Sequence, residues 1–185
     1  MHKLLPLTEA ELPGDLAALL RPRIARLGYL GEFFRYSAHQ PKALMSFMQF
    51  TEDLKEALPD KLTETIALTV ARLMDNAYER VQHERLSLKK GFGEPWVREV
   101  LSIQAKENRI LAKEEILAQK LVIAVIQQKG KNCAAELDAV IHAIGPQKAI
   151  AVLMLIGRYV THALIVNSLN LAPPVPSPLE NNKDA

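Results

Sequence analysis

The sequence predicts an all-α protein, and three observations support this fold class. Helix-forming residues such as Ala, Leu, Glu, Lys, Gln and Met dominate almost every window of the 185-residue chain. Alternating β-branched runs flanked by turn pairs, which would indicate strands, are nearly absent. Apolar residues instead recur at the three- and four-residue spacing of helices. A chain of this length is expected to form one domain, since domains of roughly 100 to 150 residues are the commonest size.

The first 40 residues predict short helices that pack on the core rather than one long element. Two prolines and two glycines interrupt the segment 12–37, and each of them disfavours a continuous helix. A cleaner helix is expected from Pro41, which suits a first helical position, to Ala57. The interrupting residues are Pro13, Pro22, Gly28 and Gly31.

Residues 41–171 are expected to form the helical core domain. The next helix starts near Lys61 and repeats apolar residues at helical spacing. The pattern pauses at Asp75 and Asn76, and a polar helix then runs to Gly91, a natural stop. These two helices form a hairpin or a kinked pair. Further helices are predicted over 94–105, 113–128, 133–144 and 146–169.

Two segments near the C-terminus have an unusual composition. The tail 172–185 contains four prolines followed by polar residues, so it is expected to be extended, either disordered or draped over a neighbour. The apolar stretch 149–166 has the length of a membrane span, but Gly157, Arg158 and His162 interrupt it. A buried core helix is therefore predicted there, and no membrane partner is expected.

Composition narrows the classes of function. A quarter of the residues are charged but the net charge is only +2, so nucleic acid is not an expected partner. The N-terminus turns acidic within its first ten residues and lacks a secretory signal, which predicts a cytoplasmic location. No glycine-rich phosphate loop or serine nucleophile elbow is found. Cys133 is the single cysteine, which excludes Cys-X-X-Cys chemistry within this chain.

The segment from Glu64 to His83, ETIALTVARLMDNAYERVQH, contains the most informative motif. It resembles the core motif of the alkylhydroperoxidase D-like (AhpD-like) family, in which a glutamate on one helix is followed by Cys-X-X-Cys at the start of the next helix and then by a histidine. In this sequence Glu64 occupies the position of that glutamate and His83 that of the histidine. Asn76 and Glu79 occupy the two cysteine positions, so both thiols are absent.

The order Tyr78-Glu79-X-X-X-His83 is similar to a cysteine-less subgroup of this family and to its carboxymuconolactone decarboxylase branch, which works without thiols. The resemblance implies an AhpD-like helical fold in a homo-oligomer, as a trimer, hexamer or dimer. It also implies a small-molecule pocket at the helix junction, a small organic acid or lactone as substrate, and no cofactor.

The residues by themselves leave two interpretations of the motif open. Glu79 and His83 lie four residues apart, so on a helix they share a face where a carboxylate can tune a histidine for acid–base catalysis. Equally, they can form an ordinary surface pair that contributes ~0.2 to 0.5 kcal/mol, with Asn76 and Glu79 resembling a capping box. Periodicity alone makes Glu64 a solvated charge, and only the motif singles it out.

Four further residues are candidates for substrate binding, namely Tyr78, Asn76, Tyr159 and His162. A tyrosine hydroxyl can donate a hydrogen bond to a substrate oxygen, and Tyr159 and His162 share a face of the last predicted helix. Arg158 beside them is a cation able to neutralise a substrate carboxylate. The alternative is a packing tyrosine, a core histidine and an arginine whose charged end reaches solvent.

A metal site is not expected. Glu64, Glu79 and His83 form a carboxylate-rich set, but helical di-iron sites use Glu-X-X-His with a second copy of the motif. Here the spacing is one residue longer and no second copy is present.

Three hypotheses of function follow. In the first, the chain is a decarboxylase-type enzyme in which His83 transfers protons with help from Glu64 and Glu79. In the second, it is a peroxidase-related antioxidant protein, although dithiol peroxidase activity is not expected without a thiol pair. In the third, it is a non-catalytic binding or assembly module.

Overall fold

The computed structural model of the chain describes residues 4–106 and 110–180. Within those ranges every regular element is a helix, so the predicted all-α class is confirmed. Contacts divide the chain into two compact units, Met1–Glu52 and Asp53–Ala185, and every predicted site residue belongs to the second. The division falls inside helix α3 (Pro41–Ala57), and the domain limits drawn from the sequence remain predictions.

The first unit contains short helical elements and the larger part of α3. The helix α1 starts directly after Pro13 and ends at Gly28, whose φ of 81° is a left-handed conformation that glycine adopts without strain. The elements of this unit are the 3-10 turn η1 (Glu9–Glu11), α1 (Gly14–Leu27), α2 (Glu32–Ser37) and the part of α3 up to residue 52.

Pro22 does not interrupt α1, which corrects the expectation drawn from the sequence. A proline inside a helix removes one backbone hydrogen bond and strains the preceding turn, at a cost of roughly 3 kcal/mol. Leu16 and Leu20 lie on the same helix and are fully buried. Burying two leucines contributes about 1.5 to 3 kcal/mol each, which offsets the proline.

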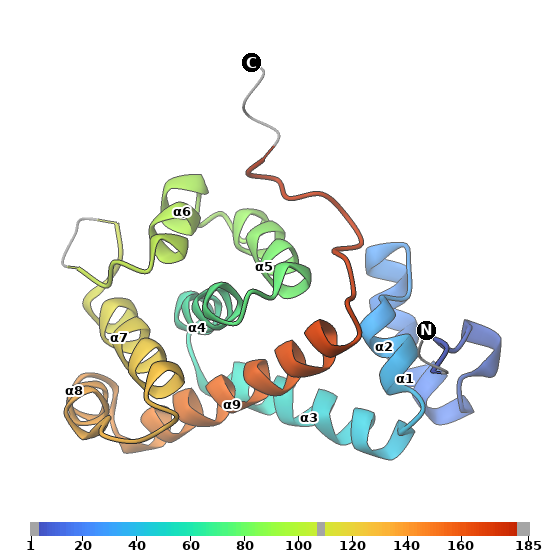
Figure 1. Cartoon of the computed structure of the whole chain (residues 1–185), viewed down its shortest axis with the longest axis horizontal. Coiled ribbons are helices and arrows are strands. Elements are labelled where there is room, and N and C mark those ends of the chain that lie inside the picture. The colour runs from blue at the N-terminus through green and yellow to red at the C-terminus, as the bar shows by residue number, and fades with distance from the viewer. Residues whose placement is uncertain (1–3, 107–109, 181–185) are drawn as a thin grey trace. The chain divides into compact units, whose positions relative to one another are not determined.

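The second unit is arranged around α4. In Figure 1 this helix lies in the middle of the unit, and α5, α6, α7 and α9 all pack against it. The sequence predicts one inward face for α4, yet its residues are buried without interruption from Leu62 to Ala71. A glutamate on this helix is therefore buried whichever way it points. The elements are α4 (Asp60–Leu73), α5 (Ala77–Lys89), α6 (Glu94–Ser102), α7 (Lys113–Gln127), α8 (Ala134–Ile144) and α9 (Pro146–Ser168).

The turn between α4 and α5 forms where the sequence pattern pauses. Asp75 adopts a left-handed conformation with φ 49°, which ends α4 and reverses the chain. Asn76 then caps α5, because its side-chain oxygen accepts a hydrogen bond from the backbone N–H of Glu79 at 3.0 Å. The predicted pair of helices is thus a hairpin.

The later helices match their predicted limits within one residue, except α6. This helix ends at Ser102 rather than at Ala105, because Ile103 and Ala105 adopt positive φ values of 55° and 46° that a right-handed helix excludes.

The C-terminal tail contains no helix within the described residues and ends there in a turn at 178–180, and the extended tail drawn from the sequence remains a prediction. It lies against its own unit, since Ser177 donates a hydrogen bond to the buried carboxylate of Glu84 at 2.6 Å. Arg98 on α6 also donates to the backbone carbonyl of Leu179 at 3.2 Å. The predicted tail residues 181–185 lie outside the described part of the chain.

By its length and composition, the helix α9 could cross a membrane. Within the described ranges no other helix meets these two criteria. Half of its most apolar window is buried within the chain, and buried core helices meet the same test.

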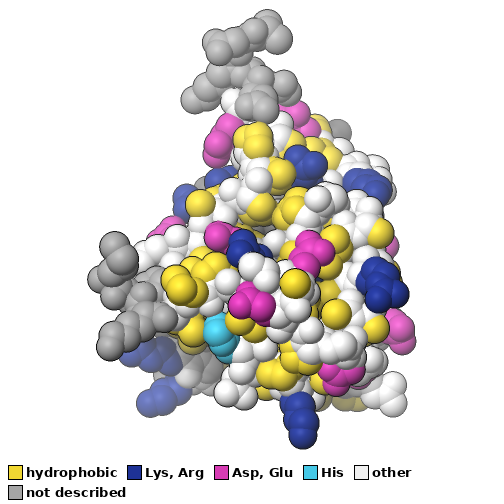
Figure 2. All heavy atoms as spheres, turned by 90° about the vertical axis from the view of Figure 1, so that its right-hand side faces the viewer, with side chains coloured by type: hydrophobic (Ala, Val, Ile, Leu, Met, Phe, Trp, Pro, Cys, Tyr) yellow, Lys and Arg dark blue, Asp and Glu magenta, His cyan; other side chains and the backbone are white. Residues whose placement is uncertain are grey.

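On the face shown in Figure 2, acidic, basic and apolar side chains are intermixed rather than gathered by type. The homo-oligomer expected from the resemblance stays a prediction.

Candidate functional site

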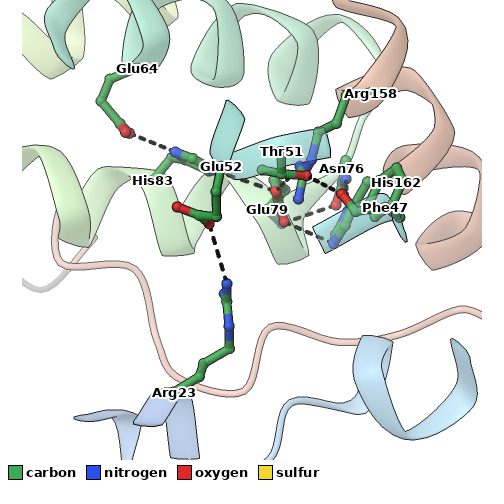
Figure 3. Close-up of polar contacts among 10 residues, drawn as sticks. All are labelled: Arg23, Phe47, Thr51, Glu52, Glu64, Asn76, Glu79, His83, Arg158 and His162. Atoms are coloured by element: carbon green, nitrogen blue, oxygen red, sulfur yellow. Dashed lines mark hydrogen bonds and ion pairs between the residues drawn. The ribbon is translucent and has the colours of Figure 1, made fainter. Parts of the chain in front are cut away.

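The helix hairpin brings Glu64 and His83 together. Glu64 projects from the first turns of α4, and His83 from the middle of α5, which runs back alongside it. The imidazole Nδ1 lies 2.6 Å from the Glu64 carboxylate Oε2, a charge-assisted hydrogen bond (Figure 3). Only 2% of Glu64 and 7% of His83 is exposed, so Glu64 is not the solvated charge that periodicity suggested.

Glu79 is the centre of the site because three nitrogen groups surround its carboxylate. Arg158 Nη1 donates to Oε1 at 2.8 Å, and His162 Nε2 lies 3.0 Å from Oε2. The second imidazole nitrogen of His83, Nε2, lies 3.4 Å from Oε1. Figure 3 shows this carboxylate between the α5 histidine and the two α9 side chains. The pair Glu79 and His83 is therefore buried and shared with α9, not an isolated surface pair.

The helix α9 supplies more of the site than its predicted residues. Tyr159 is buried and its ring meets the His83 ring edge-on, with centroids 5.2 Å apart. The Arg158 guanidinium lies over the Tyr159 ring at 4.3 Å, and His162 is buried. The sequence identified Arg158 as a nearby cation but did not include it among the site residues. Its position four residues before His162 was the available signal, because that spacing places both side chains on one helix face.

Tyr78 and Asn76 lie at the start of α5, close to His162. The Tyr78 ring is buried and its centroid is 6.1 Å from that of His162, so its position is that of a packing residue beside the site. Asn76 is 1% exposed and its side-chain Nδ2 lies 3.4 Å from His162 Nδ1.

His83 is a stable imidazolium in this environment. Burial alone would lower its pKa, but the neighbouring Glu64 carboxylate and the hydrogen bonds to Glu64 and Glu79 raise the pKa of His83 from 6.5 to about 9. At neutral pH both ring nitrogens therefore carry protons. The site contains an acid at this position rather than a free base.

Glu79 and His162 have shifted pKa values as well. Burial would raise the pKa of Glu79, but the facing His162, the Arg158 guanidinium and the hydrogen bond from His83 hold it well below 4.5. Burial, together with the charges of Arg158 and His83, lowers the pKa of His162 to about 4 despite Glu79. His162 is then neutral at neutral pH, and the cations that face Glu79 are Arg158 and His83.

These protonation states balance the charge of the cluster. Two carboxylates, Glu64 and Glu79, face two cations, His83 and Arg158. In the described part of the chain, no group of three or more His, Cys, Asp or Glu side chains is arranged to hold a metal ion.

A surface cavity of about 370 Å³ opens at the N-terminal end of α5. Arg72, Arg80 and Asn76 are among the residues that line it. Asn76 is also one of the site residues predicted from the sequence.

Cys133 belongs to another part of the unit. It precedes α8, where its thiol donates to the carbonyl of Lys131 at 3.0 Å.

The comparisons with known proteins agree on the architecture. No protein-family model matches the sequence, and no curated protein matches it. Among solved structures, an alkylhydroperoxidase AhpD core, described as an uncharacterized peroxidase-related protein from Ralstonia eutropha JMP134, is 15% identical with a TM-score of 0.79, over 94% of each chain.

Two other solved structures are similar. The debrominase Bmp8 in complex with 2,3,4-tribromopyrrole is 14% identical with a TM-score of 0.79, over 93% of this chain and 91% of that one. A protein of unknown function from Agrobacterium tumefaciens is 16% identical with a TM-score of 0.65, over 76% of this chain and 97% of that one. At these identities the likeness concerns the fold. The chain therefore has the AhpD-like helical fold that the sequence motif predicted.

Proposed function

We propose that this protein is a cofactor-free acid–base enzyme of the carboxymuconolactone decarboxylase and AhpD-like family, acting in the cytoplasm as a homo-oligomer on a small organic acid or lactone. The observation that carries the proposal is the buried chain of contacts from Glu64 through His83 to Glu79. Shifted pKa values in a partly enclosed cluster are typical of catalytic sites.

His83 is the proton donor in this proposal. When a substrate loses carbon dioxide, the bond to its carboxyl carbon breaks and the electron pair stays on the remaining carbon. The Nε2 proton of His83 then transfers to that carbon, and the neutral imidazole recovers a proton from solvent. The contact of Nε2 with Glu79 at 3.4 Å is much longer than the 2.6 Å contact of Nδ1 with Glu64, which makes the Nε2 proton the more easily transferred of the two. Glu64 holds the opposite nitrogen and fixes the ring.

The test is turnover of carboxymuconolactone and of a panel of related lactones and small organic acids, followed by product NMR and carbon dioxide release. Wild-type protein should consume at least one compound, with kcat/KM falling as pH rises through about 9, where His83 loses its proton. His83→Gln should lower kcat/KM by about 10² to 10⁴-fold, the usual contribution of a general acid.

The matched control is His142→Gln, which alters an exposed histidine on α8 and should leave turnover unchanged. An equally active His83→Gln variant would exclude the proposed role. Wild-type protein that binds a compound from the panel without converting it would instead favour the non-catalytic binding module.

The peroxidase-related hypothesis is supported by the fold that this chain shares with the AhpD core from Ralstonia eutropha JMP134 and with the Agrobacterium tumefaciens protein. A dithiol mechanism needs a thiolate and a resolving thiol, and Asn76 and Glu79 occupy those positions. We expect no peroxide consumption with a dithiol reductant above the level of a Cys133→Ser variant. Robust wild-type turnover that the Cys133→Ser change removes would overturn this expectation.

A further inference from the structure

The amide of Asn76 contacts two different elements of the site. Its Oδ1 accepts the backbone N–H of Glu79 at 3.0 Å, and its Nδ2 lies 3.4 Å from Nδ1 of His162 (Figure 3). Asn76 is only 1% exposed. A helix cap needs the first contact only. The second one joins α5 to α9 and has no role in capping.

These two contacts, together with the carboxylate of Glu79, indicate which nitrogen of His162 carries its proton. A backbone N–H can only donate, so the amide atom that faces Glu79 must be the oxygen. The atom that faces His162 is then the NH₂ group, which has no lone pair to offer and can only donate. Nδ1 of His162 must therefore be the acceptor. A neutral histidine has one N–H, so that proton belongs on Nε2, the atom 3.0 Å from Glu79 Oε2.

We propose that Asn76 is a positioning residue, which acts with Glu79 to hold neutral His162 in its Nε2–H tautomer: the amide donates to Nδ1 on one side of the ring, and the carboxylate accepts from Nε2 on the other. The tautomer of His162 is inferred from these contacts, and only its importance for catalysis rests on the proposed function. With this tautomer, Glu79 faces N–H groups from Arg158, His83 and His162. The opposite tautomer would turn a lone pair of His162 toward the carboxylate.

This arrangement keeps the proton donor, His83, from losing its proton to the neighbouring carboxylate of Glu79. Glu79 surrounded by donors has little tendency to take the Nε2 proton of His83, so that proton is kept for a substrate. The charged groups that face His162 are Glu79 from α5 and Arg158 from its own helix, with His83 beyond them. Asn76 lies at Nδ1, on the opposite side of the ring from Glu79.

The experiment compares two cap-competent variants with wild-type protein. Asn76→Ser keeps an oxygen for the Glu79 N–H but lacks the amide donor, and Asn76→Asp places an acceptor where the donor stood. Nitrogen-15 NMR of the histidine rings reports directly which ring nitrogen is protonated, and His162→Gln identifies the His162 signals.

At neutral pH wild-type His162 should be in the Nε2–H form. Asn76→Asp should add a proton on Nδ1 and so give the imidazolium, because the ring then lies between two carboxylates. Asn76→Ser should keep the neutral Nε2–H form, because Glu79 still accepts from Nε2. A wild-type Nδ1–H form, or an Asn76→Asp ring that stays neutral, would overturn the proposal. The NMR result does not depend on turnover, so a failure of the proposed enzyme activity would leave it standing, and the reverse also holds.

Discussion

Replacing His83 by glutamine should lower the free energy of unfolding by about 3 to 5 kcal/mol, the usual cost of leaving one partner of a buried ion pair alone. Glu64 is 2% exposed, and its carboxylate Oε2 lies 2.6 Å from Nδ1 of His83. Without the imidazolium, the carboxylate remains in a low-dielectric core with no cation beside it. An ordinary surface pair, which the four-residue spacing allowed, would cost only ~0.2 to 0.5 kcal/mol.

The double variant Glu64→Gln with His83→Gln tests the reason for this loss. It removes both charges, so it should recover most of the stability that His83→Gln alone loses. Urea denaturation of the wild type, the two single variants and the double variant gives the coupling energy. The exposed His142→Gln control should stay within about 0.5 kcal/mol of wild type. Additive losses in the double variant would show that Glu64 and His83 do not depend on each other.

The fold was accessible from sequence because its signals are local. The pause at Asp75 and Asn76 marked the hairpin turn, since both residue types suit a left-handed turn and a helix cap. The prediction of a break at Pro22 was wrong because the cost of a proline inside a helix can be seen in the local sequence, whereas the burial of Leu16 and Leu20 that offsets it comes from tertiary packing. The end of α6 was missed because no proline or glycine marks the positive φ of Ile103.

The site was accessible only in part, because its decisive contacts join distant segments. Periodicity made Glu64 a surface charge, since an amphipathic helix was assumed, whereas α4 is enclosed on all sides and buries it. Only the family motif identified this residue. Arg158 pairs with a carboxylate 79 positions earlier, and no local pattern predicts that contact. Together with His162 and His83, it holds the pKa of Glu79 well below 4.5 despite the burial of that carboxylate.

Stability should pass through a maximum near pH 6.5 and fall on both sides. The pKa of His83 is about 9 in the folded chain against 6.5 for a free histidine, so its contribution is complete below pH 6.5 and is lost as the pH rises through about 9. That difference corresponds to on the order of 3 kcal/mol. His162 has the opposite sign, because its pKa is lowered to about 4, and its contribution is lost as the pH falls from 6.5 through 4. The lowered pKa of Glu79 adds to the loss in acid.

Urea denaturation at intervals between pH 4 and 9.5 measures both limbs, and two variants assign them. The alkaline decline should be absent in the Glu64→Gln, His83→Gln double variant, which has neither charge, while its acid decline persists. His162→Gln should instead flatten part of the acid decline and keep the alkaline one. The single variant His83→Gln is unsuitable here, because its unpaired Glu64 introduces a pH dependence of its own. A wild-type protein whose stability stays constant or rises between pH 6.5 and 9 would show that His83 is not held as an imidazolium, and the acid assigned to the site would then be lost as well.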